Sequence, residues 1–175
     1  MRIRDAVPAD AEAIAAIYND AVENTTAIWN ERTVDADDRR SWMAARRDQG
    51  YPVRVVVDDG PSRHGGEVLG YATFGDWRAF DGFRHTVEHS VYVRADQRGR
   101  GLGRLLMEDL IPLARACDKH VMVAAIEAGN VGSIRLHEKL GFVSVGVMPQ
   151  VGTKFGRWLA LAWMQLTLDD SPAPH

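Results

Sequence analysis

Hydrophobic and polar residues follow two different periods along the chain. Apolar residues three and four positions apart mark helix faces, as between Ile14 and Val22, whereas short apolar or alternating runs mark strands. Helical patterns begin near residues 10, 34, 102 and 130. Strands are predicted at residues 1–6, 53–57, 68–74, 86–93, 121–126, 142–148 and 158–168. Loops are predicted at 24–32, 58–66, 76–85 and 150–157.

The order of these elements predicts a fold class. Strands followed by helices, with antiparallel hairpins at both ends of the chain, are typical of a mixed α/β sheet. The chain has 175 residues, and a domain usually holds ~100–200 residues. We therefore expect a single domain over residues 1–170, followed by a disordered tail over 171–175.

Charge and cysteine content narrow the class of protein. Lys plus Arg is 21 and Asp plus Glu is 24, and the resulting net charge of −3 argues against nucleic acid as the main partner. The single cysteine, Cys117, excludes an internal disulfide and a cysteine-rich zinc site, and it fits a reducing compartment. No apolar run approaches the ~20 residues of a membrane helix, and the first residues lack the apolar core of a signal peptide. We expect a cytoplasmic protein with no membrane partner.

The strongest chemical signal is a group of three glycines between a strand and a helix, in the sequence Arg98-Gly-Arg-Gly101-Leu-Gly103. Glycine permits positive φ and the close approach of another group to the backbone. A helix N-terminus adds unpaired N–H groups and a partial positive charge, so the segment suits a phosphate. It is not a P-loop, since no Lys follows, and Leu106 stands where a dinucleotide loop needs glycine. A tight turn before a helix is the alternative interpretation.

The same segment resembles the GCN5-related N-acetyltransferase family, whose pattern R/Q-x-x-G-x-G/A is met by Arg98 and the last two glycines. A second family element is matched from Asn130 to Phe142, and the order and spacing of both agree with the family. The resemblance implies the family's α/β fold, with a mostly antiparallel central sheet flanked by helices, and acetyl-CoA as co-substrate. It implies cofactor contacts at Val91, Tyr92, Val93, Arg98, Gly99, Arg100, Gly101, Leu102, Gly103, Arg104, Asn130 and Ser133.

The contacts implied for Val91 and Val93 are made by backbone N–H groups, which would bond the pantetheine and the thioester carbonyl. Such donors stabilise charge that develops on the carbonyl oxygen. The strand must leave these groups unpaired, so we expect its pairing to be interrupted near residues 89–91.

A closer resemblance, running nearly end to end, is to the phosphinothricin and methionine sulfoximine N-acetyltransferases. The matching stretches are Tyr18-Asn19-Asp20-Ala21, Thr25-Thr26, 87–93, 136–138 and 154–158. These enzymes acetylate the α-amine of a small amino acid analogue, which implies the same class of acceptor here. In the related enzymes the loop that corresponds to 150–158 lies near a dimer interface, so the resemblance also implies a homodimer.

Glu88 is the first candidate for catalysis. Strand alternation places Thr86 and Glu88 on one face and Val87 and His89 on the other. A carboxylate within an apolar strand is costly unless it is paired or exposed. It is either an exposed edge residue or a general base, which would take the proton of the attacking amine and whose pKa partial burial would raise. The family resemblance implies a catalytic carboxylate at this position.

His137 is the second candidate for catalysis, on the second family element. Many family members have a tyrosine there that is proposed to protonate the departing thiolate, and the phosphinothricin-type enzymes have a histidine. A thiol has a pKa of ~8.5, so its thiolate leaves tolerably well, and we expect His137 to matter less than Glu88. A role as a base, from its ordinary pKa of ~6.5, and a position on the helix surface are the alternatives.

The 76–85 loop combines aromatic and charged residues. Arginine binds carboxylates through two parallel hydrogen bonds, and aromatic walls hold a side chain. Arg78 is the first candidate for the acceptor carboxylate and Arg84 the second, and solvated loop charges are the alternative for both. From the resemblance and from proximity to the strand, we expect the acceptor site to include Trp29, Arg78, Phe80, Arg84, Thr86, Val87 and Glu88.

These observations predict an acetyl-CoA-dependent N-acetyltransferase that acts on the α-amine of a small amino acid or analogue by direct transfer in a ternary complex. The alternatives are acetylation of a peptide N-terminus or a polyamine, and a non-catalytic acyl-CoA sensor that keeps only the glycine loop. The arginines of the 76–85 loop argue against a polyamine site. No metal is expected, because His85 and His89 lack an apparent third ligand.

Overall fold

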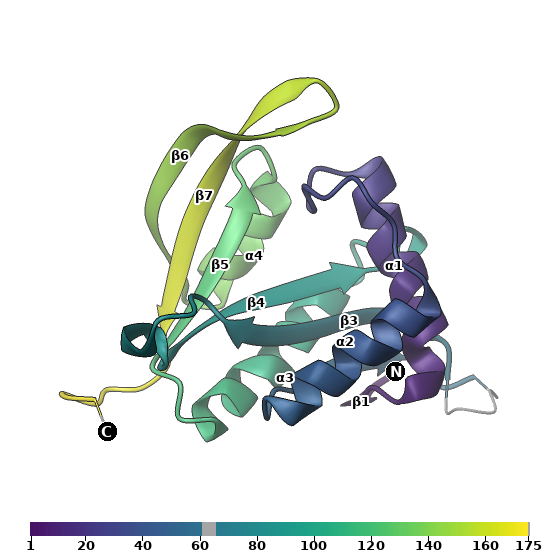
Figure 1. The fold of residues 1–175 in the computed structure, drawn as a ribbon, viewed down its shortest axis with the longest axis horizontal. Coiled ribbons are helices and arrows are strands. Elements are labelled where there is room, and N and C mark those ends of the chain that lie inside the picture. Colours follow the sequence, from purple (N-terminus) through teal and green to yellow (C-terminus); the bar gives the residue numbers. More distant parts are fainter. Residues whose placement is uncertain (61–65, 175) are drawn as a thin grey trace. The chain divides into compact units, whose positions relative to one another are not determined.

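The computed structural model of the chain describes residues 1–60 and 66–174. Residues 61–65 of the predicted 58–66 loop and His175 of the predicted tail lie outside the described residues. The helices are α1 (Ala11–Asn24), α2 (Ala36–Asp48), α3 (Leu102–Ala116) and α4 (Val131–Lys139). The strands are β1 (Arg2–Asp5), β2 (Val53–Val57), β3 (Val68–Asp76), β4 (Thr86–Val93), β5 (Val121–Glu127), β6 (Val143–Lys154) and β7 (Arg157–Thr167) (Figure 1). None of the described helices is long and apolar enough to cross a membrane.

Hydrogen bonds order the described strands as β1-β2-β3-β4-β5-β7-β6. The chain divides into two compact units, the first made of Met1–Thr73 and Ser90–Leu110 and the second of Phe74–His89 and the residues from Ile111 onward. Strands β3 and β4 and helix α3 each run from one unit into the other. The units are therefore interleaved in sequence, and the single domain over 1–170 stays a prediction.

The first unit builds a core on one face of its strands. β1 and β3 both pair with β2 in antiparallel orientation, so alternate residues of β2 point to the same side. Trp42 and Met43 of α2 border this core, and α1 contributes two isoleucines. Figure 1 shows the two helices α1 and α2. The buried cluster consists of Ile14, Ile17, Val53, Val55, Val57, Val68 and Tyr71.

Gly70 of β3 lets α3 approach the other face of these strands. A Cβ atom at this position would lie 2.8 Å from the carbonyl oxygen of Tyr92 and 3.3 Å from Cδ1 of Leu106. Gly70 neighbours Tyr71 in β3, so it points to the face opposite the cluster above. Because the contact with Tyr92 is to backbone, a side chain at residue 70 would force β3 and β4 apart.

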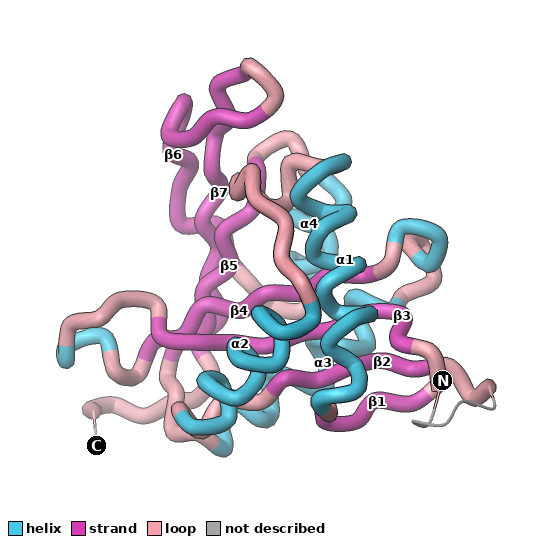
Figure 2. Tube along the Cα trace, turned by 45° about the vertical axis from the view of Figure 1, so that its right-hand side comes forward, coloured by secondary structure: helices cyan, strands magenta, loops and turns pink. Residues whose placement is uncertain are grey.

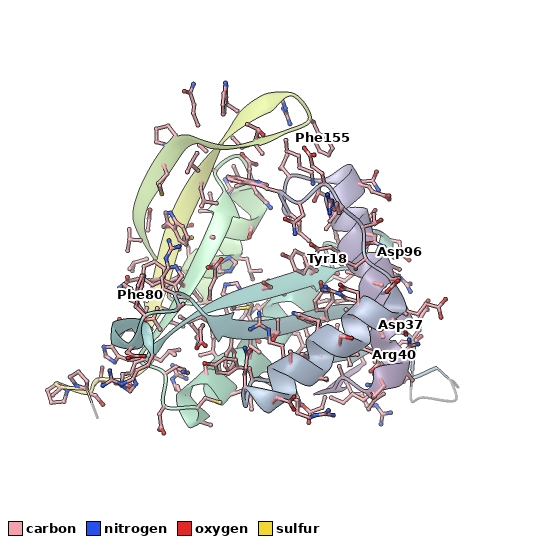
Figure 3. The ribbon with its side chains drawn as sticks, in the orientation of Figure 1. Tyr18, Asp37, Arg40, Phe80, Asp96 and Phe155 are labelled. Atoms are coloured by element: carbon pink, nitrogen blue, oxygen red, sulfur yellow. The ribbon has the colours of Figure 1, made fainter. Side chains whose placement is uncertain are left out.

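The second unit contains a parallel pair and a long antiparallel hairpin. β4 pairs with β5 over Thr86–Glu88 and Val121–Val123, and the ladder ends there, in agreement with the predicted interruption near residues 89–91. β5 and β6 each pair with β7 in antiparallel orientation. The β6–β7 hairpin turns at Phe155 and Gly156, which have φ of 51° and 69°, and Figure 3 shows Phe155 at its tip.

The predicted mixed sheet is confirmed, since β4–β5 is parallel and the terminal hairpins β2–β3 and β6–β7 are antiparallel. The prediction of a loop over 150–157 was wrong, because β6 continues to Lys154. Its register shifts between Met148 and Gly152, where Gln150 has φ of 56°, and pairing with β7 then resumes. Pro149 and Gly152 are turn residues in composition, but here they mark a bulge within a strand.

Candidate active site

Glu88 lies on the half-buried face of β4. Burial alternates along the strand, with Val87 and His89 buried and Thr86 and Glu88 half-buried, as strand alternation predicted. Burial raises the pKa of the Glu88 carboxyl above its ordinary value, because the charged form loses hydration. The nearby charge of Arg78 opposes part of this rise. A half-buried carboxyl with a raised pKa has the property that a general base near neutral pH requires.

The segment between β3 and β4 is held by aromatic contacts. The Trp77 ring makes edge contacts with Phe83, at 5.1 Å between ring centroids, and with Trp163 of β7, at 6.2 Å. Phe80 lies 6.5 Å from Phe83 and is 75% exposed (Figure 3). Aromatic burial thus fixes this loop to β7 while Phe80 stays accessible to a ligand.

The two arginines proposed for the acceptor carboxylate have different surroundings. The Arg78 guanidinium lies 5.1 Å from the centroid of the Trp77 ring, and its charge acts on Glu88. Arg84 Nη1 donates to the carbonyl oxygen of Asp81, 3.2 Å away, within the turn of its own loop. Arg78 is therefore the arginine that is electrostatically linked to the candidate base.

His137 of α4 is buried and paired with His89 of β4. It is 1% exposed, so it is not a helix-surface residue. The two Nε2 atoms are 3.0 Å apart, and the ring planes lie within 16° of each other. His137 Nδ1 is 2.7 Å from the carbonyl oxygen of Ser133. Phe142 packs edge-on against both rings, with centroids 5.0 and 5.7 Å away.

The hydrogen bonds of this pair assign its protons. A carbonyl oxygen only accepts, so His137 Nδ1 donates to Ser133 and the Nε2 of the neutral ring accepts. His89 Nε2 must then donate to it, which leaves His89 Nδ1 as a buried acceptor without a hydrogen bond among the described residues. Burial lowers the pKa of both imidazoles, that of His89 to about 3. Both rings are neutral at neutral pH, and protein atoms occupy both nitrogens of His137.

Asn130 forms the N-terminal cap of α4. Its side-chain Oδ1 accepts the N–H of Ser133, 3.1 Å away, as expected for an N-cap asparagine. Ser133 also supplies the carbonyl that binds His137, so one turn of α4 links the cap to the histidine pair. Asn130 itself is exposed.

In the first unit, residues 98–104 form the glycine loop and the start of α3. Gly99 and Gly101 have φ of 77° and 81°, values at which a side chain is strained. The N–H of Leu105 bonds the carbonyl oxygen of Gly101 over 3.0 Å, so the N–H groups of residues 102–104 belong to the first helical turn. Amides of a first turn have no partner within the helix and carry partial positive charge. This is the geometry of an anion-binding helix N-terminus.

Three exposed arginines surround the glycine loop. Arg98 Nη2 donates to Oδ2 of Asp20 on α1, 2.9 Å away. Arg104 pairs with Glu108 one turn along α3, at 2.7 Å. Arg100 adds a third guanidinium, and the three charges favour an anion at this loop.

The remaining predicted residues are distributed over both units. Trp29 lies between α1 and α2, and its Nε1 donates to the carbonyl oxygen of Thr26 over 2.9 Å. The Tyr92 ring lies 5.4 Å from that of Tyr71, and Val91 and Val93 are half-buried. The first unit holds Trp29, 91–93 and 98–104, whereas the second holds Arg78, Phe80, Arg84, Thr86, Val87, Glu88, Asn130, Ser133 and His137.

Sequence analysis assigned no role to two residues that contact predicted ones. His89 bonds His137, and strand alternation placed it on the same face as Val87, which does not indicate its partner. Asp20 bonds Arg98. It belongs to the stretch 18–21 that resembles the related enzymes, but no residue near it in the sequence suggests this contact. Within the described part of the chain, no group of three or more His, Cys, Asp or Glu side chains is placed to hold a metal ion.

Comparison with known proteins identifies the family. The model of the acetyltransferase (GNAT) family matches residues 14–142. The chain belongs to the GNAT acetyltransferases. It is 64% identical to an L-methionine sulfoximine/L-methionine sulfone acetyltransferase of Pseudomonas paraeruginosa, over 95% of this chain and 94% of the relative. It is 60% identical to the L-amino acid N-acyltransferase MnaT of Escherichia coli, over 99% of this chain and 98% of the relative.

A solved GNAT structure shares the fold over nearly the whole chain. It is an acetyltransferase of Salmonella typhimurium with its cofactor acetyl-CoA, 58% identical, with a TM-score of 0.94 over 99% of this chain and 97% of that one. The family and the fold implied by the glycine loop and the α4 element are thereby confirmed, and so is acetyl-CoA as the family's co-substrate.

Proposed function

We propose that this GNAT protein transfers the acetyl group of acetyl-CoA to the α-amine of a small amino acid or amino acid analogue, such as methionine sulfoximine, methionine sulfone or phosphinothricin. The proposal is supported by relatives at 60–64% identity, which are named for L-methionine sulfoximine and L-methionine sulfone or for L-amino acids. The observation that carries the chemistry is Glu88, a half-buried carboxyl whose pKa burial raises and the charge of Arg78 partly lowers. A carboxylate base beside a guanidinium suits a zwitterion, which has one proton to lose and one carboxylate to be held.

The proposed reaction is a direct transfer. Glu88 takes one proton from the acceptor ammonium, and the neutral amine attacks the thioester carbonyl carbon. The new C–N bond forms and the C–S bond breaks, so that coenzyme A leaves as a thiolate. The amide nitrogen loses its second proton to solvent, and the thiolate takes up a proton from solvent. The thiolate needs little acid assistance, because its conjugate acid has a pKa of ~8.5.

The cofactor is held in this proposal by backbone and charge. The glycine loop and the first turn of α3 bind the pyrophosphate, and Arg98, Arg100 and Arg104 add charge. The backbone N–H groups of Val91 and Val93 polarise the thioester carbonyl. Asn130 already uses its Oδ1 as the α4 cap, so its Nδ2 is the group that we assign to a pantetheine carbonyl.

His137 acts in the proposal through its position. Both of its ring nitrogens are bound to protein atoms, so Nε2 holds no proton for the thiolate and no open lone pair for the amine. We therefore assign the proton transfer to Glu88 alone. The histidine pair fixes α4 to β4, and with α4 it fixes the Asn130 cap.

Acceptor recognition is assigned to Arg78 for the carboxylate and to Phe80 for the side chain, with Thr86 and Val87 beside Glu88 on β4. Trp29 and Arg84 complete the proposed set. Arg84 takes second place to Arg78 because its guanidinium bonds the carbonyl oxygen of its own turn.

We propose further that the protein is a homodimer that works in the cytoplasm. β6 lies at the end of the strand order, and its Val143, Val145 and Val147 are 59, 55 and 56% exposed. An exposed apolar edge strand is a site for pairing with a second chain, and a second copy of β6 would cover it. Cys117, the single cysteine of the sequence, fits a reducing compartment. Sedimentation of the wild type beside Val145→Lys tests the dimer, since a charge on this edge should give monomers.

The function is tested by thiol release from acetyl-CoA with a panel of acceptors. The panel holds methionine sulfoximine, methionine sulfone, phosphinothricin, free amino acids, a polyamine and a short peptide. We expect turnover with the small amino acids and analogues alone. Turnover with only the polyamine or the peptide would overturn the acceptor class. Binding of acetyl-CoA without turnover of any acceptor would favour a sensor.

A further inference from the structure

The connection between α1 and α2, residues 25–35, contains neither helix nor strand (Figure 2). It is longer than most helix–helix connections, which have ~2–8 residues. This one carries Trp29, which the proposed function assigns to the acceptor site. An irregular loop can hold a ligand-binding side chain in place only if other residues fix its backbone, and the contacts at the end of α1 do so.

Asn19 on α1 fixes the far end of this loop. Its Nδ2 donates to the carbonyl oxygen of Val34 and its Oδ1 accepts the Val34 N–H, both over 2.9 Å. One side-chain amide thus satisfies both backbone groups of a residue 15 positions away, as a neighbouring strand would. Asn19 is half-buried, so water competes less for these two bonds than at an open surface.

The residues next to Asn19 bind the rest of the loop. The hydroxyl of Tyr18 accepts from Nδ2 of Asn30 over 2.7 Å, and Figure 3 shows Tyr18 on α1. At the near end, Oγ1 of Thr25 donates to the carbonyl oxygen of Ala21, 2.7 Å away. The loop is therefore tied to α1 on both sides of Trp29.

Asp20, the next residue of α1, bonds the cofactor loop instead. Its Oδ2 accepts from Arg98 over 2.9 Å, and its Oδ1 accepts from Nδ2 of Asn24 over 2.9 Å. Substitution of Asn19 leaves both of these bonds intact. The kinetics of acetyl-CoA can therefore serve as an internal control for any effect on the acceptor.

We propose that Asn19 is a positioning residue for acceptor binding, which holds the 25–35 loop in its binding conformation through its two bonds to Val34. The inference rests on the proposed function. If the loop is released, only a fraction of molecules is competent to bind, and the apparent acceptor affinity falls by that fraction.

The test compares Asn19→Ala with Asn24→Ala. Both replace an asparagine of α1 by alanine, but Asn24, the last residue of the helix, bonds Asp20 and not the loop. For Asn19→Ala we expect the acceptor KM to rise about tenfold, the effect of two lost backbone bonds at roughly half their usual strength. The acetyl-CoA KM and the kcat at saturating acceptor should stay within about twofold, and Asn24→Ala should match the wild type in all three.

Hydrogen exchange of the Val34 amide supplies a direct readout. We expect faster exchange in Asn19→Ala, wild-type exchange in Asn24→Ala, and an intermediate acceptor KM in Asn19→Asp, which still accepts the Val34 N–H but cannot donate. If Asn19→Ala does not fold, Asn19→Asp replaces it in the test. Faster Val34 exchange with an unchanged acceptor KM would overturn the proposal, as would unchanged exchange in Asn19→Ala.

Failure of the proposed function would look different. It would appear as wild-type protein that turns over none of the amino acid acceptors, before any variant is compared. A wild type that acetylates them, with an Asn19→Ala variant of equal acceptor KM, would reject the positioning role and leave the proposed function standing.

Discussion

Glu88 and His89 are neighbours in sequence and lie on opposite faces of β4, yet their environments differ in kind. Glu88 is half-buried, and its raised pKa is set by partial burial and the charge of Arg78. His89 is buried, neutral and bound to His137, and its pKa is lowered to about 3. One strand therefore presents a titratable group on one face and a fixed, uncharged pair on the other.

The difference shows how the same physical effect serves two purposes. Desolvation disfavours charge in both residues. Glu88 is an acid with a cation nearby, Arg78. Its raised pKa still allows the carboxyl to ionise and to exchange a proton with an acceptor. For two histidines without a nearby acid, desolvation removes the charge and leaves a hydrogen bond between the two Nε2 atoms that joins α4 to β4. The variants below separate activity on the first face from stability on the second.

The largest effect is expected for Glu88→Gln. The amide keeps the size of the side chain but takes up no proton, and loss of a general base typically costs ~10²–10⁴ in rate. We expect kcat to fall by roughly this factor at saturating acceptor, with an unchanged melting temperature, because the variant removes no bond of the buried pair. Steady-state thiol release and a thermal melt measure the two quantities. Turnover near the wild-type rate would show that Glu88 is not the base.

His89→Leu should affect mainly stability. It removes the donor to His137 Nε2 and leaves a buried acceptor unpaired, which costs about 1–3 kcal/mol of unfolding free energy. His89→Gln is the matched control, since its amide can still donate. Urea unfolding of both variants measures the difference. Equal stability of the Leu variant and the wild type would mean that the His89–His137 bond contributes nothing.

The same pair predicts how stability depends on pH. In the unfolded chain a histidine takes up a proton below its ordinary pKa of ~6.5, whereas folded His89 does so only near pH 3. The unfolded state thus binds more protons, so the unfolding free energy falls as the pH drops from 6.5, by up to about 1.4 kcal/mol per unit for one group. Urea unfolding at pH 7, 6 and 5 should show a smaller slope for His89→Gln. If the unfolding free energy of His89→Gln and of the wild type depended on pH with the same slope, a group other than His89 would be responsible for the pH dependence.

The smallest effect is expected for Arg78→Ala. Loss of its charge should raise the acceptor KM by about tenfold, the value of one exposed charge-assisted contact. It should also move the acidic limb of the kcat/KM profile to higher pH, because Arg78 holds the pKa of Glu88 down. Arg84→Ala is the competing variant. A larger rise of the acceptor KM in Arg84→Ala than in Arg78→Ala, with no pH shift in Arg78→Ala, would assign the carboxylate to Arg84.

Much of the fold was predictable from the sequence, and the exceptions share a cause. The helices, the hairpins and the alternation of β4 follow from local periodicity, so they agree with the prediction. β6 was predicted too short because Pro149 and Gly152 are turn residues in composition, whereas the strand passes them as a bulge and pairs again with β7. Whether a glycine marks a turn or a bulge depends on the partner strand, which local sequence does not specify.

The candidate site likewise has features that local sequence predicts and contacts that it does not predict. The glycine loop was readable because its chemistry is contiguous: positive φ at Gly99 and Gly101 and a helix start directly after them. Trp77 and Trp163, which anchor the 76–85 loop, are far apart in sequence, and no spacing rule relates them. The sequence offered Arg78 as the first candidate and Arg84 as the second, and the structure shows that the charge of Arg78 acts on Glu88.

The sequence by itself determined the order of helices and strands, the glycine loop that precedes α3, the face of β4 that carries Glu88 and the family. All of these depend on residues within a few positions of one another, where backbone periodicity fixes the geometry. The tertiary structure decided three hydrogen bonds. His89 rather than solvent bonds Nε2 of His137, Asn19 bonds the backbone of Val34, and Asp20 bonds Arg98. These contacts join residues 15 to 78 positions apart, and only packing of the elements brings such residues together.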